Sequence, residues 1–87
     1  MEKTQQKWID RKKRYDNPEI VSSEIYLGMF RLNVHKHIDY PKNIWLASCY
    51  PDIFKCRELK NKDLEKAKPE AVEILKTILK DALKALN

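Results

Sequence analysis

The spacing of apolar residues in the C-terminal stretch, residues 64–86, constrains the fold most strongly. At 3.6 residues per turn, the apolar side chains fall on one broad side of a helix and most charged side chains fall on the other. The apolar side consists of Leu64, Ala67, Ala71, Val72, Ile74, Leu75, Ile78, Leu79, Ala82, Leu83, Ala85 and Leu86. An apolar arc this broad requires a flat partner surface rather than the narrow seam of a coiled coil. The sequence therefore predicts one long amphipathic helix lying on a sheet.

Pro69 interrupts this pattern because it has no N–H to donate to the carbonyl of Glu65. Either one helix bends at Pro69, or a second helix begins there with proline at its first position. Pro69 falls on the solvent side, and helices that cover a core curve with their convex side towards water. We therefore predict one continuous, bent helix, with Asn61 as its N-cap.

Strand patterns come before the helix. From Met29 apolar and polar residues alternate, so that Phe30, Leu32 and Val34 share one face. Turn residues follow at 39–43, a returning strand is expected at 44–50, and a third, shorter strand at 55–59. The predicted fold is α+β: a small three-stranded antiparallel meander with the C-terminal helix packed on one face. Phe30, Leu32 and Val34 are expected to meet Leu75, Ile78, Leu79 and Ala82 of the helix.

The positive charge is concentrated at the N-terminus. The net charge is +5, and residues 1–15 contain six lysines and arginines against two acidic residues. Residues 1–23 show no sustained apolar period, so we expect a partly ordered basic arm held to the body by Trp8. Residues 24–87 are expected to form a single domain.

Composition excludes several functional classes. A single glycine argues against glycine-rich phosphate loops, and no apolar run approaches the ~20 residues of a membrane span. The first residues lack the apolar segment of a secretion signal, and two cysteines are too few for a disulfide scaffold. We therefore expect a cytoplasmic protein with reduced thiols, no cofactor and no membrane contact. No nucleophile with a partner base is apparent, so we do not expect an enzyme.

One metal site is conceivable. His35 and His37 share a strand face, Cys49 lies on the next strand, and Cys56 lies on the third. If the strands pair so that His35 faces Ala47, then His37 faces Trp45 and Asn33 faces Cys49. Imidazole and thiolate are the ligands of zinc, but a Cys-x₂-Cys spacing is absent. The spacing therefore favours surface histidines and small buried cysteines over a zinc site.

A nucleic-acid surface is the alternative function. Basic residues of the arm would contact phosphates, and aromatic residues of the sheet would stack on bases. The candidates are Arg11, Lys12, Lys13, Arg14, Arg31, His35, Tyr40 and Trp45, and Tyr50 is a further ring near Arg31 on which bases could stack. Short basic runs are also common in solvated tails, and aromatic rows on sheets are common in cores.

Residues 44–79 resemble part of a known family. The segment Ile-Trp-Leu-Ala-Ser-Cys-Tyr-Pro-Asp-Ile-Phe-Lys-Cys, followed by Lys-Asp-Leu-Glu-Lys-Ala-Lys-Pro-Glu-Ala-Val-Glu-Ile-Leu, is similar to the strand–Pro-Asp–strand–helix part of HicB-type antitoxins. The resemblance implies a β-β-β-α domain that pairs with a HicA toxin. Glycines usual around that turn are replaced by Phe54 and Lys55, and no ribbon-helix-helix or helix-turn-helix segment follows.

The leading functional prediction is a small non-enzymatic protein that acts by protein–protein contact. One helix covers only one sheet face, which leaves the other face and the edge strands available. We therefore expect a homodimer formed through a sheet edge or the uncovered face. An antitoxin-like protein or a protein of a phage or mobile element fits this description.

Overall fold

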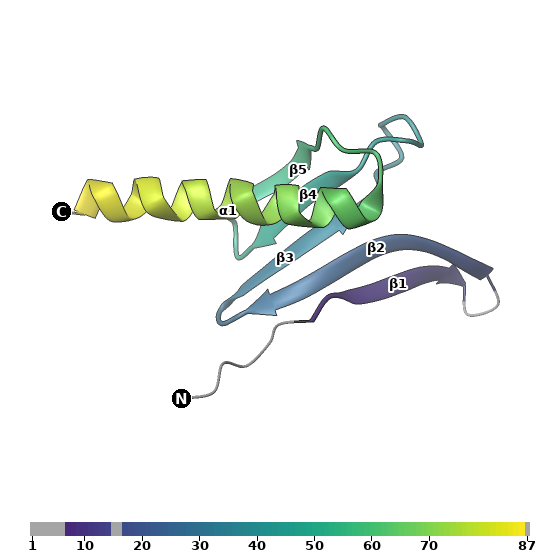
Figure 1. Ribbon diagram of the computed structural model, residues 1–87, viewed down its shortest axis with the longest axis horizontal. Coiled ribbons are helices and arrows are strands. Elements are labelled where there is room, and N and C mark those ends of the chain that lie inside the picture. The colour runs from purple at the N-terminus through teal and green to yellow at the C-terminus, as the bar shows by residue number, and fades with distance from the viewer. Residues whose placement is uncertain (1–6, 15–16, 87) are drawn as a thin grey trace.

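The chain forms a five-stranded antiparallel sheet with a single helix on one face, as Figure 1 shows. The computed structural model describes residues 7–14 and 17–86, with only the backbone described at residues 13, 14, 17 and 18. The elements are β1 (Ile9–Arg14), β2 (Asn17–Leu27), β3 (Phe30–His35), β4 (Leu46–Tyr50), β5 (Phe54–Glu58) and α1 (Leu64–Leu86). Neighbouring strands in the sheet are consecutive in the chain, so the sheet is a simple meander.

The predicted α+β meander with a C-terminal helix is confirmed, but three strands is an undercount. The expected strands correspond to β3, β4 and β5, whereas β1 and most of β2 lie in residues 1–23, for which we expected a partly ordered arm. The β2–β3 turn consists of Gly28 and Met29, and Gly28 adopts a φ of 63°, a conformation that favours glycine. This glycine before an alternating run was the available signal for a hairpin.

The hydrophobic core lies between α1 and the face of the sheet that we call the covered face. Its buried members are Ile25, Leu32, Val34, Trp45, Ala47, Cys49, Leu59, Ala67, Ala71 and Leu75. Leu32 and Val34 point towards the helix as predicted, and Leu75 meets them. Leu79 and Ala82, which we expected in the same contact, are exposed because the end of α1 extends past the sheet (Figure 1).

The β3–β4 register differs by one residue from the expected one. His35 lies opposite Leu46 rather than Ala47, and Asn33 lies opposite Ser48 rather than Cys49. β3 ends at His35, so His37 is not paired with Trp45. Because strand side chains alternate between faces, a shift of one residue moves every side chain of a strand to the other face. The observed register places Cys49 in the core and Ser48 on the opposite face.

β1 is joined to α1 by a buried lysine. Lys68 Nζ lies 3.2 Å from Asp10 Oδ1 of β1 and 2.9 Å from Glu65 Oε2 one turn earlier in the helix. Burial alone would lower the pKa of Lys68, but these two carboxylates outweigh burial and raise it. Ser23 Oγ donates to Asp10 Oδ1 at 2.5 Å and lowers the pKa of that carboxyl. Trp8 packs beside this polar contact, as predicted, with Lys68 Nζ 5.7 Å from its ring.

The helix is continuous through Pro69, as predicted, but Asn61 is not its N-cap. α1 begins at Leu64, and the carbonyl of Asp63 accepts the first helical hydrogen bond, from Ala67 N at 2.8 Å. Asn61 is instead bound by Glu70, whose Oε1 accepts hydrogen bonds from the backbone and side-chain nitrogens of Asn61 at 3.0 and 2.9 Å. Glu70 Oε2 also accepts the backbone N–H of Lys60 at 2.8 Å. Glu70 thus attaches the β5–α1 loop to the second turn of the helix.

Replacing Leu32 tests the core. Leu32 is fully buried between the sheet and α1, so Leu32→Ala removes buried methyl groups and leaves a cavity. We expect the free energy of unfolding, measured by urea titration, to fall by about 2–5 kcal/mol. Ile38→Ala, at a residue that is almost fully exposed, should change the free energy of unfolding by less than about 0.5 kcal/mol. Equal effects of the two substitutions would contradict the observed core.

Acid titration tests Glu70. Burial alone would raise its pKa, but the N–H groups of Lys60 and Asn61 outweigh burial and hold the pKa below its ordinary value of 4.5. A carboxyl with a lowered folded-state pKa stabilises the fold above its unfolded-state pKa, and this stabilisation is lost as the pH falls through the folded-state value. As the pH decreases below about 4.5, the free energy of unfolding of Glu70→Gln, measured by urea titration, should therefore fall less than that of wild type. Glu73→Gln, at an exposed residue of the same helix, should leave this pH dependence closer to wild type.

Candidate functional site

The four residues considered for a metal site are not brought together. Cys49 is buried beneath α1, and its burial raises the pKa of the thiol, which disfavours the thiolate that zinc binds. His35 lies on the opposite face of the sheet, which we call the open face. His37 lies in the β3–β4 loop beside Asp39 and Cys56 in the edge strand β5. No group of three metal-binding side chains occurs within residues 7–14 and 17–86.

The residues considered for nucleic-acid binding are divided between several environments. Trp45 lies in the core, where its indole Nε1 donates to the carbonyl of Lys62 at 3.0 Å, so it is not available for stacking. Tyr40 lies in the β3–β4 loop, with its ring 5.8 Å from that of His37. Lys12 is exposed on β1, and the side chains of Lys13 and Arg14 lie outside the described residues. The remaining candidates share the open face: Arg11, Arg31, His35 and Tyr50.

The open face is built by rows of side chains that run across β2, β3 and β4. Because directly opposed residues of antiparallel strands share a face, the register defines three such rows. The rows are Tyr26–Arg31–Tyr50, Glu24–Asn33–Ser48 and Ser22–His35–Leu46. Most of these side chains are polar, in contrast to the apolar covered face. The sequence prediction missed Tyr26, Glu24 and Ser48 because it did not identify β2 and shifted the register of β4.

Glu24 is the electrostatic centre of the open face. Arg11 Nε donates to Glu24 Oε1 at 2.6 Å, and Arg31 Nε lies 3.7 Å from Glu24 Oε2. The Glu24 side chain is only 8% exposed, whereas the side chains of Arg11 and Arg31 are 59% and 44% exposed. The hydrogen bond to Glu24 raises the pKa of Arg11. Arg31 also lies over the ring of Tyr50, with Cζ 4.7 Å from the ring centroid. The carboxylate is therefore covered by two guanidinium groups that face solvent.

Ser48 and His35 form a hydrogen-bonded pair that joins three strands. His35 Nδ1 lies 3.0 Å from the carbonyl of Lys36, which only accepts, so we assign the proton to Nδ1. His35 Nε2 then accepts from the Ser48 hydroxyl at 2.7 Å, and Ser48 Oγ in turn accepts the backbone N–H of Cys56 at 2.9 Å. A serine beside a histidine is also the arrangement of an activated nucleophile. Ser48 is only 1% exposed, however, so its hydroxyl serves here to join β3, β4 and β5.

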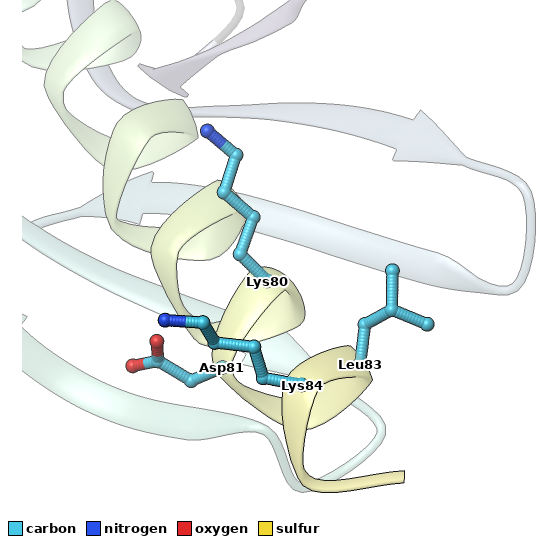
Figure 2. Close-up of a pocket in the computed structure, with 4 residues that line it drawn as sticks. All are labelled: Lys80, Asp81, Leu83 and Lys84. Carbon is cyan, nitrogen blue, oxygen red and sulfur yellow. The ribbon is translucent and has the colours of Figure 1, made fainter. Parts of the chain in front are cut away.

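Exposed leucines occupy the end of α1, beyond the sheet. Leu79, Leu83 and Leu86 are 39%, 62% and 83% exposed. A hollow near this end is lined by Lys80, Asp81, Leu83 and Lys84, all from α1 itself. Figure 2 shows that Leu83 projects to the opposite side of the helix from Asp81. The end of α1 therefore has an apolar side and a charged side.

Comparisons with known proteins give no assignment. No protein-family model, curated protein or solved structure matches the chain. The resemblance to HicB-type antitoxins therefore stays a prediction from the sequence. Among the residues that the structure describes, no helix has both the length and the apolar character needed to span a bilayer.

Removing the Ser48 hydroxyl tests its role between the strands. Ser48→Ala leaves the Cys56 N–H and the His35 ring without their buried partner, so the free energy of unfolding should fall by about 1–3 kcal/mol. Urea titration measures this change. Ser22→Ala, on the same face but opposite His35 and outside this pair, provides the control and should have a smaller effect. A neutral Ser48→Ala substitution would contradict the role that we assign to the hydroxyl.

Proposed function

We propose that this protein acts without catalysis, through protein–protein contact, as a homodimer that pairs through the end of α1. The surface concerned, which we call the terminal stripe, consists of Leu79, Ala82, Leu83 and Leu86. The observation that carries the proposal is the exposure of these residues where α1 extends past the sheet (Figure 1). An amphipathic helix is stabilised chiefly by burying its apolar face, and a continuous apolar patch left in water marks a contact surface.

The spacing of the terminal stripe favours a second copy of the chain as the partner. Leu79, Ala82 and Leu86 follow one another at intervals of three and four residues, the spacing with which two helices pack side by side. In a twofold dimer the same patch is used by both copies, so one stripe supplies both sides of the contact. On the helix, Ile78 and Ala85 border the stripe on one side, and Lys76 and Lys80 border it on the other.

Other surfaces give less support for a dimer. β1 is an edge strand with basic residues and two register shifts, and β5 is a short edge strand with a bulge. Charged side chains and bulges are devices that prevent edge strands from pairing with other chains. The open face contains the partly exposed Arg11 and Arg31 around a nearly buried carboxylate. We therefore assign the contact to the helix rather than to a sheet edge or the open face.

The terminal stripe is short, which sets the expected strength of the dimer. Residues 78–86 of a helix span about 13 Å, so two such segments bury less than the ~1,200 Å² of a standard stable interface. We therefore expect self-association in the micromolar range rather than a permanent dimer. Mass measurements must accordingly extend to tens of micromolar protein.

Light-scattering mass measurement tests the proposal with two matched variants. Leu83→Asp places a charge in the terminal stripe, and Thr77→Asp places the same charge on the exposed polar side of the same helix. We expect wild type and Thr77→Asp to shift from monomer to dimer as concentration rises, and Leu83→Asp to weaken the dimer at least tenfold. A wild-type protein that stays monomeric, or equal dimerisation by both variants, would refute the proposal.

A further inference from the structure

We propose that the open face of the sheet binds single-stranded nucleic acid, with bases stacking on Tyr26 and Tyr50 and with Arg31 and Arg11 contacting phosphates. This function is separate from dimerisation because the open face lies on the other side of the sheet from α1. The proposal rests on the juxtaposition of two tyrosines and an arginine in one row, next to a second arginine that shares a carboxylate with the first.

The row Tyr26–Arg31–Tyr50 has the composition of a stacking surface. Tyr26 and Tyr50 each lie directly opposite Arg31 on neighbouring strands, so the two tyrosines flank one guanidinium. At the usual strand spacing, the tyrosine backbones are about 9–10 Å apart. Tyr26 is about half exposed, and the Arg31 guanidinium already lies against the Tyr50 ring. Aromatic rings and guanidinium planes are the groups on which unpaired bases stack.

The solvent-exposed charged groups next to this row are the guanidinium groups of Arg11 and Arg31. Glu24 is nearly buried, whereas the two arginines that contact it are partly exposed. Both contacts to Glu24 are made through Nε, and Arg11 is also hydrogen-bonded to the side chain of Tyr26, so this arginine and this tyrosine lie together on the face. Glu58 of β5 is a further carboxylate on this face, opposite Leu46 in the row farthest from Tyr26. Of the net charge of +5, residues 1–15 carry +4, so a polyanion is attracted chiefly to the N-terminal strand, which contributes Arg11 to this face.

The same residues favour a single strand over a duplex and over a protein partner. Bases inside a duplex do not offer their ring faces, so a row of rings on an open sheet selects unpaired bases. A protein interface of this size has an apolar centre, whereas this face places Glu24, Asn33 and Ser48 at its centre. A polar centre flanked by aromatic rings and arginines is better suited to a strand with a charged backbone and flat bases.

Fluorescence anisotropy with the full chain and a labelled oligothymidylate of about twelve nucleotides tests the proposal. We expect binding at low salt that weakens steeply between about 50 mM and 200 mM salt, and weaker competition by a blunt duplex of the same length. Tyr26→Ala should weaken binding about tenfold, whereas Tyr26→Phe, which keeps the ring, should bind like wild type. Circular dichroism checks that each variant is folded.

The charge contribution has its own matched control. Arg31→Gln and Lys66→Gln each remove one positive charge, but Lys66 is exposed on α1, away from the open face. Arg31→Gln should weaken oligothymidylate binding by at least fivefold, and Lys66→Gln should weaken it less than twofold. Equal loss in both variants would show that binding follows net charge alone and would overturn the proposal. Absence of binding by wild type at low salt, or a preference for the duplex, would overturn it as well.

Discussion

The contact between α1 and the covered face is the interaction on which the whole fold depends. Leu32, Val34 and Leu75 supply much of its buried apolar surface, and this contact is the source of the single continuous core. A chain of 87 residues buries only about 60–65% of its unfolded surface, so little else is available to offset the loss of chain entropy. Because only one helix is available, only one face of the sheet can be apolar.

The polar open face follows from that limit. A face without a covering layer cannot hide an apolar surface, so its nearly buried groups must be satisfied by hydrogen bonds and ion pairs instead. Glu24 is satisfied by Arg11 and Arg31, and Ser48 by His35 and Cys56. The oxygen Asn33 Oδ1, between these two groups, is buried without a hydrogen-bond partner among the described residues. The same limit leaves the end of α1 with no sheet beneath it.

The sequence predicted those parts of the fold in which an apolar period is uninterrupted. The helix, the alternation of Leu32 and Val34, and the burial of both against Leu75 follow from periodicity alone. β1 and β2 were missed because an aspartate and a serine lie on their covered face, where Asp10 accepts hydrogen bonds from both Ser23 and the buried Lys68. The open-face site was missed for a related reason. Register depends on loop geometry between β3 and β4, and a shift of one residue exchanges Cys49 for Ser48 on that face.

The ion pair between Asp10 and Lys68 joins residues that are 58 positions apart in the chain. During synthesis the N-terminal strand leaves the ribosome long before its helical partner. β1 can then pair with β2, but Asp10 cannot form its ion pair until the chain has been synthesised as far as Lys68. Contacts of such large sequence separation form late because loop closure costs entropy first. The N-terminal edge of the sheet therefore reaches its final environment only after the first turns of α1 have been synthesised.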